Sequence, residues 1–147
     1  MKQLILFVFI TFSISIVAQK NYSTEKGVIA EGYDVVAYFS NKAVEGNKNF
    51  ATKHDGVKFY FSSQKNLEAF IVNPTKYTPQ YGGFCSYAMA SKGKKVSSDP
   101  ETFEIRDGKL YLFYNSWGTN TFKSWTKEGP EQLIVKADKN WTKIIKK

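Results

Sequence analysis

The sequence predicts an α+β fold in which two β-hairpins build a small antiparallel sheet and several short helices accompany it. Two Asp-Gly pairs, Asp55-Gly56 and Asp107-Gly108, each separate two runs rich in β-branched and aromatic residues. Asp-Gly favours a tight hairpin turn because both central residues adopt positive φ. Other segments carry apolar residues at helical spacing. A length of 147 residues with 42% apolar content suits one globular domain.

The N-terminal segment, residues 1–18, is predicted to be a signal peptide. A basic Lys2 precedes an uncharged run at residues 4–17, and Ala18 provides a small residue for cleavage. An uncleaved anchor is the alternative, but fourteen uncharged residues are short for a bilayer span, which needs roughly 20. We therefore expect an exported protein, periplasmic or extracellular, whose residues 19–147 form a single domain without stable membrane insertion.

The mature chain is expected to begin with a short strand and the first hairpin. Residues 35–39 (VVAYF) form an apolar run that predicts a short buried strand. Residues 50–54 and 57–61 then form the first hairpin around its Asp-Gly turn. The intervening polar segment is predicted to be a loop.

A helix is predicted to follow the first hairpin. Ser62 or Ser63 caps its N-terminus, and it ends at Asn73 because Pro74 disfavours helical backbone in the residue before it. Residues 84–90 (FCSYAMA) are expected to form either a short helix or a buried turn.

A second hairpin and two further helical stretches are predicted in the second half of the chain. Asp99-Pro100 is predicted to start a helix or turn, and residues 103–114 form the second hairpin. Asn115 or Ser116 is expected to cap a helical stretch. The last helix is predicted over residues 131–141, where apolar residues four apart share one face.

Charge and composition exclude several function classes. The chain has 21 basic and 13 acidic residues, and loss of Lys2 with the signal peptide leaves a net charge of +7. Arg106 is the only arginine, whereas nucleic-acid readers favour arginine for its bidentate geometry, so we expect no nucleic-acid partner. The lysine runs at 92–95 and 143–147 can touch an anionic surface, but such charges more often form a solvated surface.

Cys85, Met89 and His54 are the candidate metal ligands. A single unpaired cysteine is unusual in an oxidising compartment, and one cysteine with one histidine excludes a zinc finger. If residues 84–90 are helical, the Cys85 thiolate and the Met89 thioether share a face, a donor pair that suits Cu(I), with His54 as a third ligand. The alternative is that Cys85 and Met89 are core residues and His54 is an exposed turn residue. No spacing places His54 beside Cys85 as a catalytic base, so we expect no enzyme.

An aromatic and glycine-rich block is the second candidate site. Its glycines allow close backbone approach to a ligand, and its aromatic rings are suited to line a pocket. The equal alternative is a tight turn covered by core tyrosines. The candidate ligand-binding residues are Tyr77, Tyr81, Gly82, Gly83, Phe84 and Tyr87.

The chain resembles YHS-domain proteins, and more closely their small exported bacterial members. The resemblance is carried by residues 32–39 (GYDVVAYF), 56–63 (GVKFYFSS) and 70–85, which include Pro79-Gln80-Tyr81-Gly82-Gly83-Phe84-Cys85, and it extends over about 33–141. It implies a small α+β unit with a hairpin followed by a helix. It also implies a metal-binding module related to the Cys-rich heavy-metal domains found beside copper-transporting ATPases.

The sequence departs from the metal-binding pattern of that family at two places. Metal-associated members carry one cysteine in the first turn and another after the hairpin, where this chain has 34–37 (DVVA) and 61–63 (FSS). Cys85 remains, in the Gly-Gly-aromatic-Cys context that exported members share. The leading hypothesis is therefore an exported, non-enzymatic binding protein that takes a soft metal, copper first, through Cys85. The alternatives are a small-ligand or protein-interaction module using residues 77–87, and a thiol-based redox protein.

Overall fold

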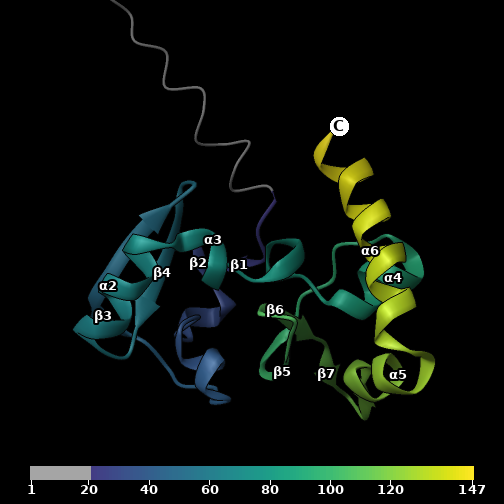
Figure 1. The fold of residues 1–147 in the computed structure, drawn as a ribbon, viewed down its shortest axis with the longest axis horizontal. Coiled ribbons are helices and arrows are strands. Elements are labelled where there is room, and N and C mark those ends of the chain that lie inside the picture. Colours follow the sequence, from purple (N-terminus) through teal and green to yellow (C-terminus); the bar gives the residue numbers. More distant parts are fainter. Residues whose placement is uncertain (1–20) are drawn as a thin grey trace, which may run out of the picture.

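The computed structural model describes residues 21–147, and the predicted signal peptide, residues 1–18, lies outside the described residues. Within them the chain is α+β, as predicted, with small sheets and several short helices (Figure 1). The first hairpin and its helices lie on one side of the view in Figure 1. The second hairpin and the C-terminal helices lie on the other side.

The first hairpin belongs to a four-stranded sheet of order β1-β2-β4-β3. Its turn, Asp55-Gly56, has φ of +50° and +75°, the positive values that Asp-Gly accommodates. β2 pairs with β4 in parallel at Val28 and Lys58, which the sequence did not predict. The strands are β1 (Thr24–Glu25), β2 (Val28–Ile29), β3 (Asn47–His54) and β4 (Val57–Phe61).

Helices α2 (Gln64–Val72) and α3 (Pro74–Tyr77) follow the hairpin. Ser63 Oγ accepts a hydrogen bond from Asn66 N at 3.2 Å, so Ser63 is the N-cap and the predicted start is confirmed. Asn73 ends α2 and its side chain caps α3, as the following proline leads one to expect.

The predicted strand at residues 35–39 is wrong. Residues 35–36 form a turn that leads into the short helix η2 (Ala37–Ser40), and another short helix, η1 (Ala30–Gly32), precedes this region. The Asp34 carboxylate accepts hydrogen bonds from Val36 N at 2.9 Å and Ala37 N at 3.2 Å. Such local bonds favour turn and helix over extended backbone, so they override the apolar pattern.

The two hairpins do not share a sheet, contrary to the expected single sheet. β5 (Asp99–Arg106) and β6 (Lys109–Phe113) form a separate two-stranded sheet. Asp99-Pro100 starts β5 and no helix, because β5 is an edge strand with an irregular register between residues 99 and 103, where a proline is tolerated.

A third hairpin replaces the helix start expected at residues 115–116. β7 (Asn115–Ser116) and β8 (Thr119–Asn120) pair around Trp117-Gly118, and Asn120 caps α5 (Thr121–Glu128). Helix α6 (Pro130–Ile145) confirms the last prediction and extends beyond it. Residues 84–90 contribute to α4 (Ser86–Lys92), the helical alternative, after the short helix η3 (Gln80–Gly83).

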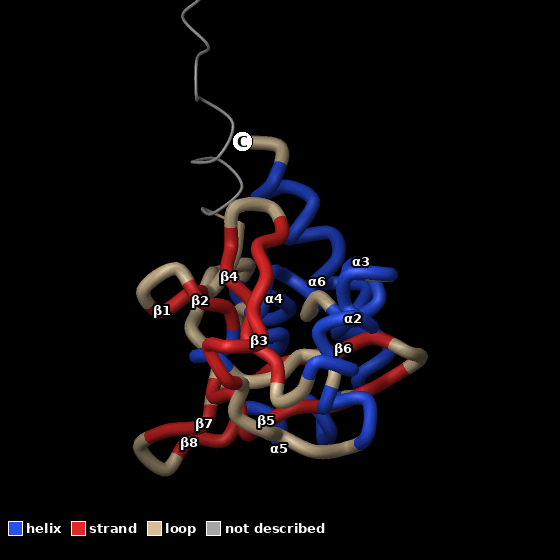
Figure 2. The backbone as a smooth tube through the Cα atoms, turned by 90° about the vertical axis from the view of Figure 1, so that its left-hand side faces the viewer, coloured by secondary structure: helices blue, strands red, loops and turns tan. Residues whose placement is uncertain are grey.

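Strand β6 lies between two hydrophobic clusters. Leu110 and Leu112 pack in the first cluster with β4 and α2, while Tyr111 and Phe113 pack in the second with α4, α5 and α6. The tip of the β3–β4 hairpin and the last turns of α6 lie at the same end of the molecule in both views (Figure 2). None of the helices in residues 21–147 combines the length and apolar character needed to cross a membrane.

Candidate functional site

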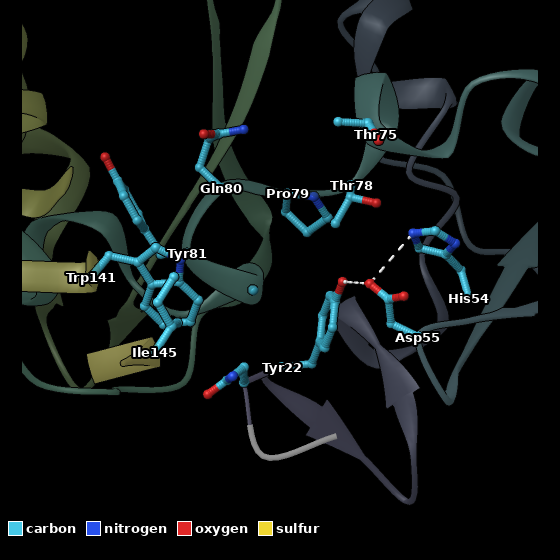
Figure 3. Close-up of a pocket in the computed structure, with 12 residues that line it drawn as sticks. Tyr22, His54, Asp55, Thr75, Thr78, Pro79, Gln80, Tyr81, Trp141 and Ile145 are labelled. Atoms are coloured by element: carbon cyan, nitrogen blue, oxygen red, sulfur yellow. Dashed lines mark hydrogen bonds and ion pairs between the residues drawn. The ribbon is translucent and has the colours of Figure 1, made fainter. Parts of the chain in front are cut away.

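A pocket of about 430 Å³ opens between the β3–β4 hairpin tip and the end of α6 (Figure 3). Residues from four parts of the chain line it: the N-terminal residues 21–22, the hairpin tip, the segment 75–82 and α6. In Figure 3, Tyr22, His54 and Asp55 stand on one side, and Tyr81, Trp141 and Ile145 stand on the other. The pocket therefore has one polar wall and one apolar wall.

The polar wall is organised around the Asp55 carboxylate. Tyr22 Oη donates a hydrogen bond to Asp55 Oδ2 at 3.0 Å, and His54 Nε2 lies 3.5 Å from the same oxygen. Burial and this hydrogen bond raise the pKa of the Tyr22 phenol above its ordinary value near 10, so Tyr22 stays a neutral donor at physiological pH. The wall thus presents a carboxylate supported by a phenol and an imidazole.

His54 is anchored at the hairpin tip by aromatic contacts. Its ring lies edge-on to Phe59 and Phe70, with centroid distances of 6.3 and 5.9 Å. The His54 side chain is 31% exposed, so it is half-buried rather than the free turn residue of the alternative interpretation.

The apolar wall is formed by rings that α6 and η3 hold together. The Tyr81 and Trp141 rings meet edge to face at 6.2 Å. Tyr81 Oη donates to Asp138 Oδ1 at 2.9 Å, which fixes the phenol against α6. Burial and this bond raise the pKa of Tyr81, which keeps the ring neutral.

The glycines of the predicted block serve close packing within the chain. A Cβ on Gly82 would lie 1.8 Å from Asn21 O, and Ser23 N donates to Gly82 O at 2.8 Å. Gly83 faces Ile29, whose Cδ1 would be 3.2 Å from an added Cβ. The close backbone approach expected for a ligand is made at Gly82 by the protein's own N-terminal segment, which thereby shapes one edge of the pocket.

The aromatic block does not converge on one site. Tyr81 and Gly82 line the pocket, whereas Tyr77 packs on Phe39 at 5.1 Å and Tyr87 Oη donates to Glu128 Oε1 at 2.7 Å. The ring centroids of Phe84 and Trp141 lie 6.4 Å apart, and Phe84 is not among the residues that line the pocket. The block therefore contributes two residues to the pocket lining and uses the others for packing and hydrogen bonds within the chain.

Cys85 is the N-cap of α4, and Met89 lies one turn further along this helix. Cys85 is fully buried; its Sγ lies 3.3 Å from Thr121 Oγ1 and accepts from Ala88 N at 3.5 Å as the N-cap. Met89 is also fully buried, and its N donates to Cys85 O at 3.0 Å. His54 ends β3 on the opposite side of the view in Figure 1, so the structure does not bring it to this pair.

A separate polar cluster surrounds Asp34, which sequence reasoning did not single out as a functional residue. Its buried carboxylate accepts from Ser62 N, Ser62 Oγ and Asn66 Nδ2 at 2.6–2.8 Å, besides the two amides already described. These hydrogen bonds join the turn after Asp34 to the segment that follows β4. Both carboxylate oxygens are occupied, which fits a structural role. Among residues 21–147, no group of three or more His, Cys, Asp or Glu is placed to hold a metal ion.

Sequence reasoning missed Tyr22, Asp55 and Trp141 as pocket residues. Asp55 was assigned to the turn alone, and no pattern links Tyr22 with Trp141 across more than a hundred residues. No protein family, curated protein or solved structure matches the chain at a significant level. The site is therefore interpreted from its own geometry.

Proposed function

We propose that the protein is an exported, non-enzymatic binding protein of the YHS type whose ligand is a small organic molecule. The observation that carries the proposal is the pocket, in which the Tyr22–Asp55–His54 wall faces the Tyr81–Trp141 wall. Its volume of about 430 Å³ lies in the range of small-molecule sites, roughly 300–1,000 Å³. Its lining combines aromatic and aliphatic side chains with convergent polar groups, and polar groups of this kind orient a ligand in small-molecule sites.

The two walls define the class of ligand. Asp55 accepts hydrogen bonds and carries negative charge, so it favours an amine or a hydroxyl on the ligand. Trp141 and Tyr81 favour a flat apolar or aromatic part, and their rings also attract a cation. A small aromatic amine satisfies both walls, and tyramine is the probe of choice.

Isothermal titration with tyramine tests the proposal. Asp55→Asn is expected to weaken binding about tenfold or more, because a charge-assisted hydrogen bond is lost. Asp107→Asn is the matched control, since Asp107 holds the same turn position, at φ +50°, in the second hairpin and lies outside the pocket. Cys85→Ser is expected to bind normally. Equal affinities of the Asp55 and Asp107 variants, or no saturable binding by the natural chain, would contradict the proposal.

The second candidate function is binding of one Cu(I) ion by Cys85 and Met89. The observation that favours it is the complete burial of Cys85, the N-cap of α4, and of Met89, which lies one turn further along the helix. Thiolate and thioether are soft ligands that suit Cu(I), and a dry site keeps the ion from water. Such a site dispenses with His54, and copper has to displace the Thr121 hydroxyl from Cys85 Sγ.

Competition with a coloured Cu(I) chelator measures this second function. The reduced natural chain is expected to take up one ion, Cys85→Ser none, and Met89→Leu an ion held more weakly. Asp55→Asn should leave uptake unchanged, which separates the two candidates. Similar weak uptake by the natural chain and by Cys85→Ser would exclude the sulfur site.

A thiol redox function ranks third. It requires a thiol that a partner reaches, and Cys85 is fully buried. We expect iodoacetamide to modify Cys85 only as fast as the fold opens, which mass spectrometry follows with and without urea. Rapid modification of Cys85 in the native chain would show that the thiol is accessible and would support a thiol redox function.

A further inference from the structure

The two lysine runs of the sequence meet at one end of the molecule. A second cavity, of about 620 Å³, lies at the C-terminal end of α6, beside the loop that follows α4. This surface, the basic face, is lined by Asn21, Lys94, Lys95, Ile144, Ile145 and Lys147. Residues some fifty positions apart thus place three ammonium groups around one hollow.

Packing between α4 and α6 fixes the position of the lysine loop. Gly93 ends α4 with φ +59°, and a Cβ there would lie 3.3 Å from Asn140 Cγ. Asn140 Nδ2 donates to Met89 O at 2.9 Å and to Ala90 O at 3.3 Å, so a side chain of α6 caps the end of α4. The loop carrying Lys94 and Lys95 is therefore held against α6.

The basic face carries an excess of positive charge. No carboxylate side chain lines the basic face. Within residues 21–147, the basic partners of the ion pairs are His54 and Arg106. Lys94 and Lys147 therefore form no ion pair with a carboxylate in this part of the chain. Lys95 Nζ contacts Asn21 Oδ1 at 3.1 Å and lies over the Trp141 ring at 5.7 Å. Lys147 follows the C-terminus of α6, where a positive charge stabilises the helix dipole. This effect does not account for Lys94 and Lys95, which come from the loop after α4.

Apolar side chains accompany these charges. Ile145 is 47% exposed, and together with Ile144 it lies among the lysines. Lysine with exposed isoleucine suits the boundary between phospholipid headgroups and acyl chains, where ammonium groups meet phosphate and apolar side chains enter the lipid.

We propose that the basic face docks on anionic phospholipid surfaces, with Lys94, Lys95 and Lys147 contacting headgroup phosphates and Ile145 entering the lipid. The basic face borders the ligand pocket, because Asn21 and Ile145 line both, whereas its three lysines lie outside that pocket. Docking involves contact with the surface and no spanning helix. Juxtamembrane lysines attract anionic lipid with about a fivefold gain in partitioning for each charge, and salt weakens the attraction.

Vesicle flotation measures the docking. The whole chain is mixed with vesicles of phosphatidylcholine alone or with added phosphatidylglycerol, and the difference between the two is the readout, because residues 4–17 act alike on both. Lys94→Gln with Lys147→Gln is expected to lower the phosphatidylglycerol-dependent partitioning about twenty-fivefold. The matched control is Lys42→Gln with Lys123→Gln, which makes the same charge change in the loop after η2 and on α5, at the opposite end in Figure 1.

The outcomes separate lipid docking from its rivals. Docking is supported if the natural chain and the control variant both partition more strongly to vesicles with phosphatidylglycerol. Salt has to remove this difference, and the Lys94/Lys147 variant has to lack it. Equal loss in both variants would assign the effect to net charge alone and overturn the proposal. Lysine-dependent binding of free glycerol phosphate without any vesicle preference would also overturn it, and would make the face a site for a soluble phosphate.

Discussion

Gly82 shows how one residue shapes the pocket. Its φ is +61°, and the backbone of Asn21 passes so close that an added Cβ would lie 1.8 Å from Asn21 O. Tyr22 then reaches Asp55, because Ser23 N is held by Gly82 O. The N-terminal segment, the η3 turn and the polar wall are therefore linked through a glycine without a side chain.

Gly82→Ala is expected to lower the free energy of unfolding by roughly 1–3 kcal/mol and to weaken tyramine binding, because the segment at residues 21–22 has to move. Gly108→Ala is the control, since Gly108 has φ +69° but nothing within 4 Å of an added Cβ. Urea unfolding compares the two variants. A Gly82 variant no less stable than the Gly108 variant would mean that the close approach costs nothing.

Strand β6 is the element that unites the molecule. Its side chains alternate between the two clusters, Leu110 and Leu112 on one face and Tyr111 and Phe113 on the other. A strand buried on both faces is unusual for a two-stranded hairpin, and here helices and the first sheet cover it from both sides. A substitution on one face of β6 should therefore destabilise both clusters.

Leu112→Ala and Phe113→Ala are each expected to lower the free energy of unfolding by about 2–5 kcal/mol, because each leaves a cavity in a packed core. The three tryptophans, Trp117, Trp125 and Trp141, all lie in the second half of the chain. Leu112→Ala, which changes the first cluster, should nevertheless shift the transition seen by tryptophan fluorescence. The exposed Lys109→Ala serves as the control, and a fluorescence transition unmoved by Leu112→Ala would mean that the halves unfold separately.

Across the whole molecule, buried tyrosines connect separate elements. Tyr38 Oη donates to Pro100 O at 2.6 Å and thus joins η2 to β5, while Tyr81 joins η3 to α6 through Asp138. Burial is the main reason that the pKa of each phenol is raised, and it raises that of Tyr111 to about 12. Each of these phenols therefore keeps its proton to a higher pH in the folded chain than in the unfolded chain.

Alkaline pH is expected to unfold the protein. In the unfolded chain these tyrosines ionise near pH 10, whereas the folded chain retains their protons, so the stabilising contribution is complete below pH 10 and is lost as the pH rises above it. Tyrosinate absorbance near 295 nm should rise in two stages, the second together with the loss of circular dichroism. Ionisation of all the tyrosines in one stage near pH 10 in an intact fold would contradict this expectation.

Local patterns in the sequence were sufficient for the elements whose causes are local. The Asp-Gly pairs placed both main hairpins, and Ser63 and Pro74 set the bounds of α2. The errors arose where distant or side-chain bonds decide the backbone. Hydrogen bonds to the Asp34 carboxylate favour the turn that leads into η2 over a strand, and the edge position of β5 accommodates Pro100.

The sequence by itself determined the α+β class, the two main hairpins and the scarcity of soft ligands, since these follow from composition and from neighbours within a few residues. Tertiary structure alone decided which candidates meet. It put Cys85 and Met89 in the core away from His54, placed His54 and Asp55 across from Trp141, and joined two lysine runs in one face. The physical reason is that these contacts depend on how α6 and the first hairpin pack around β6, a long-range arrangement that no local periodicity encodes.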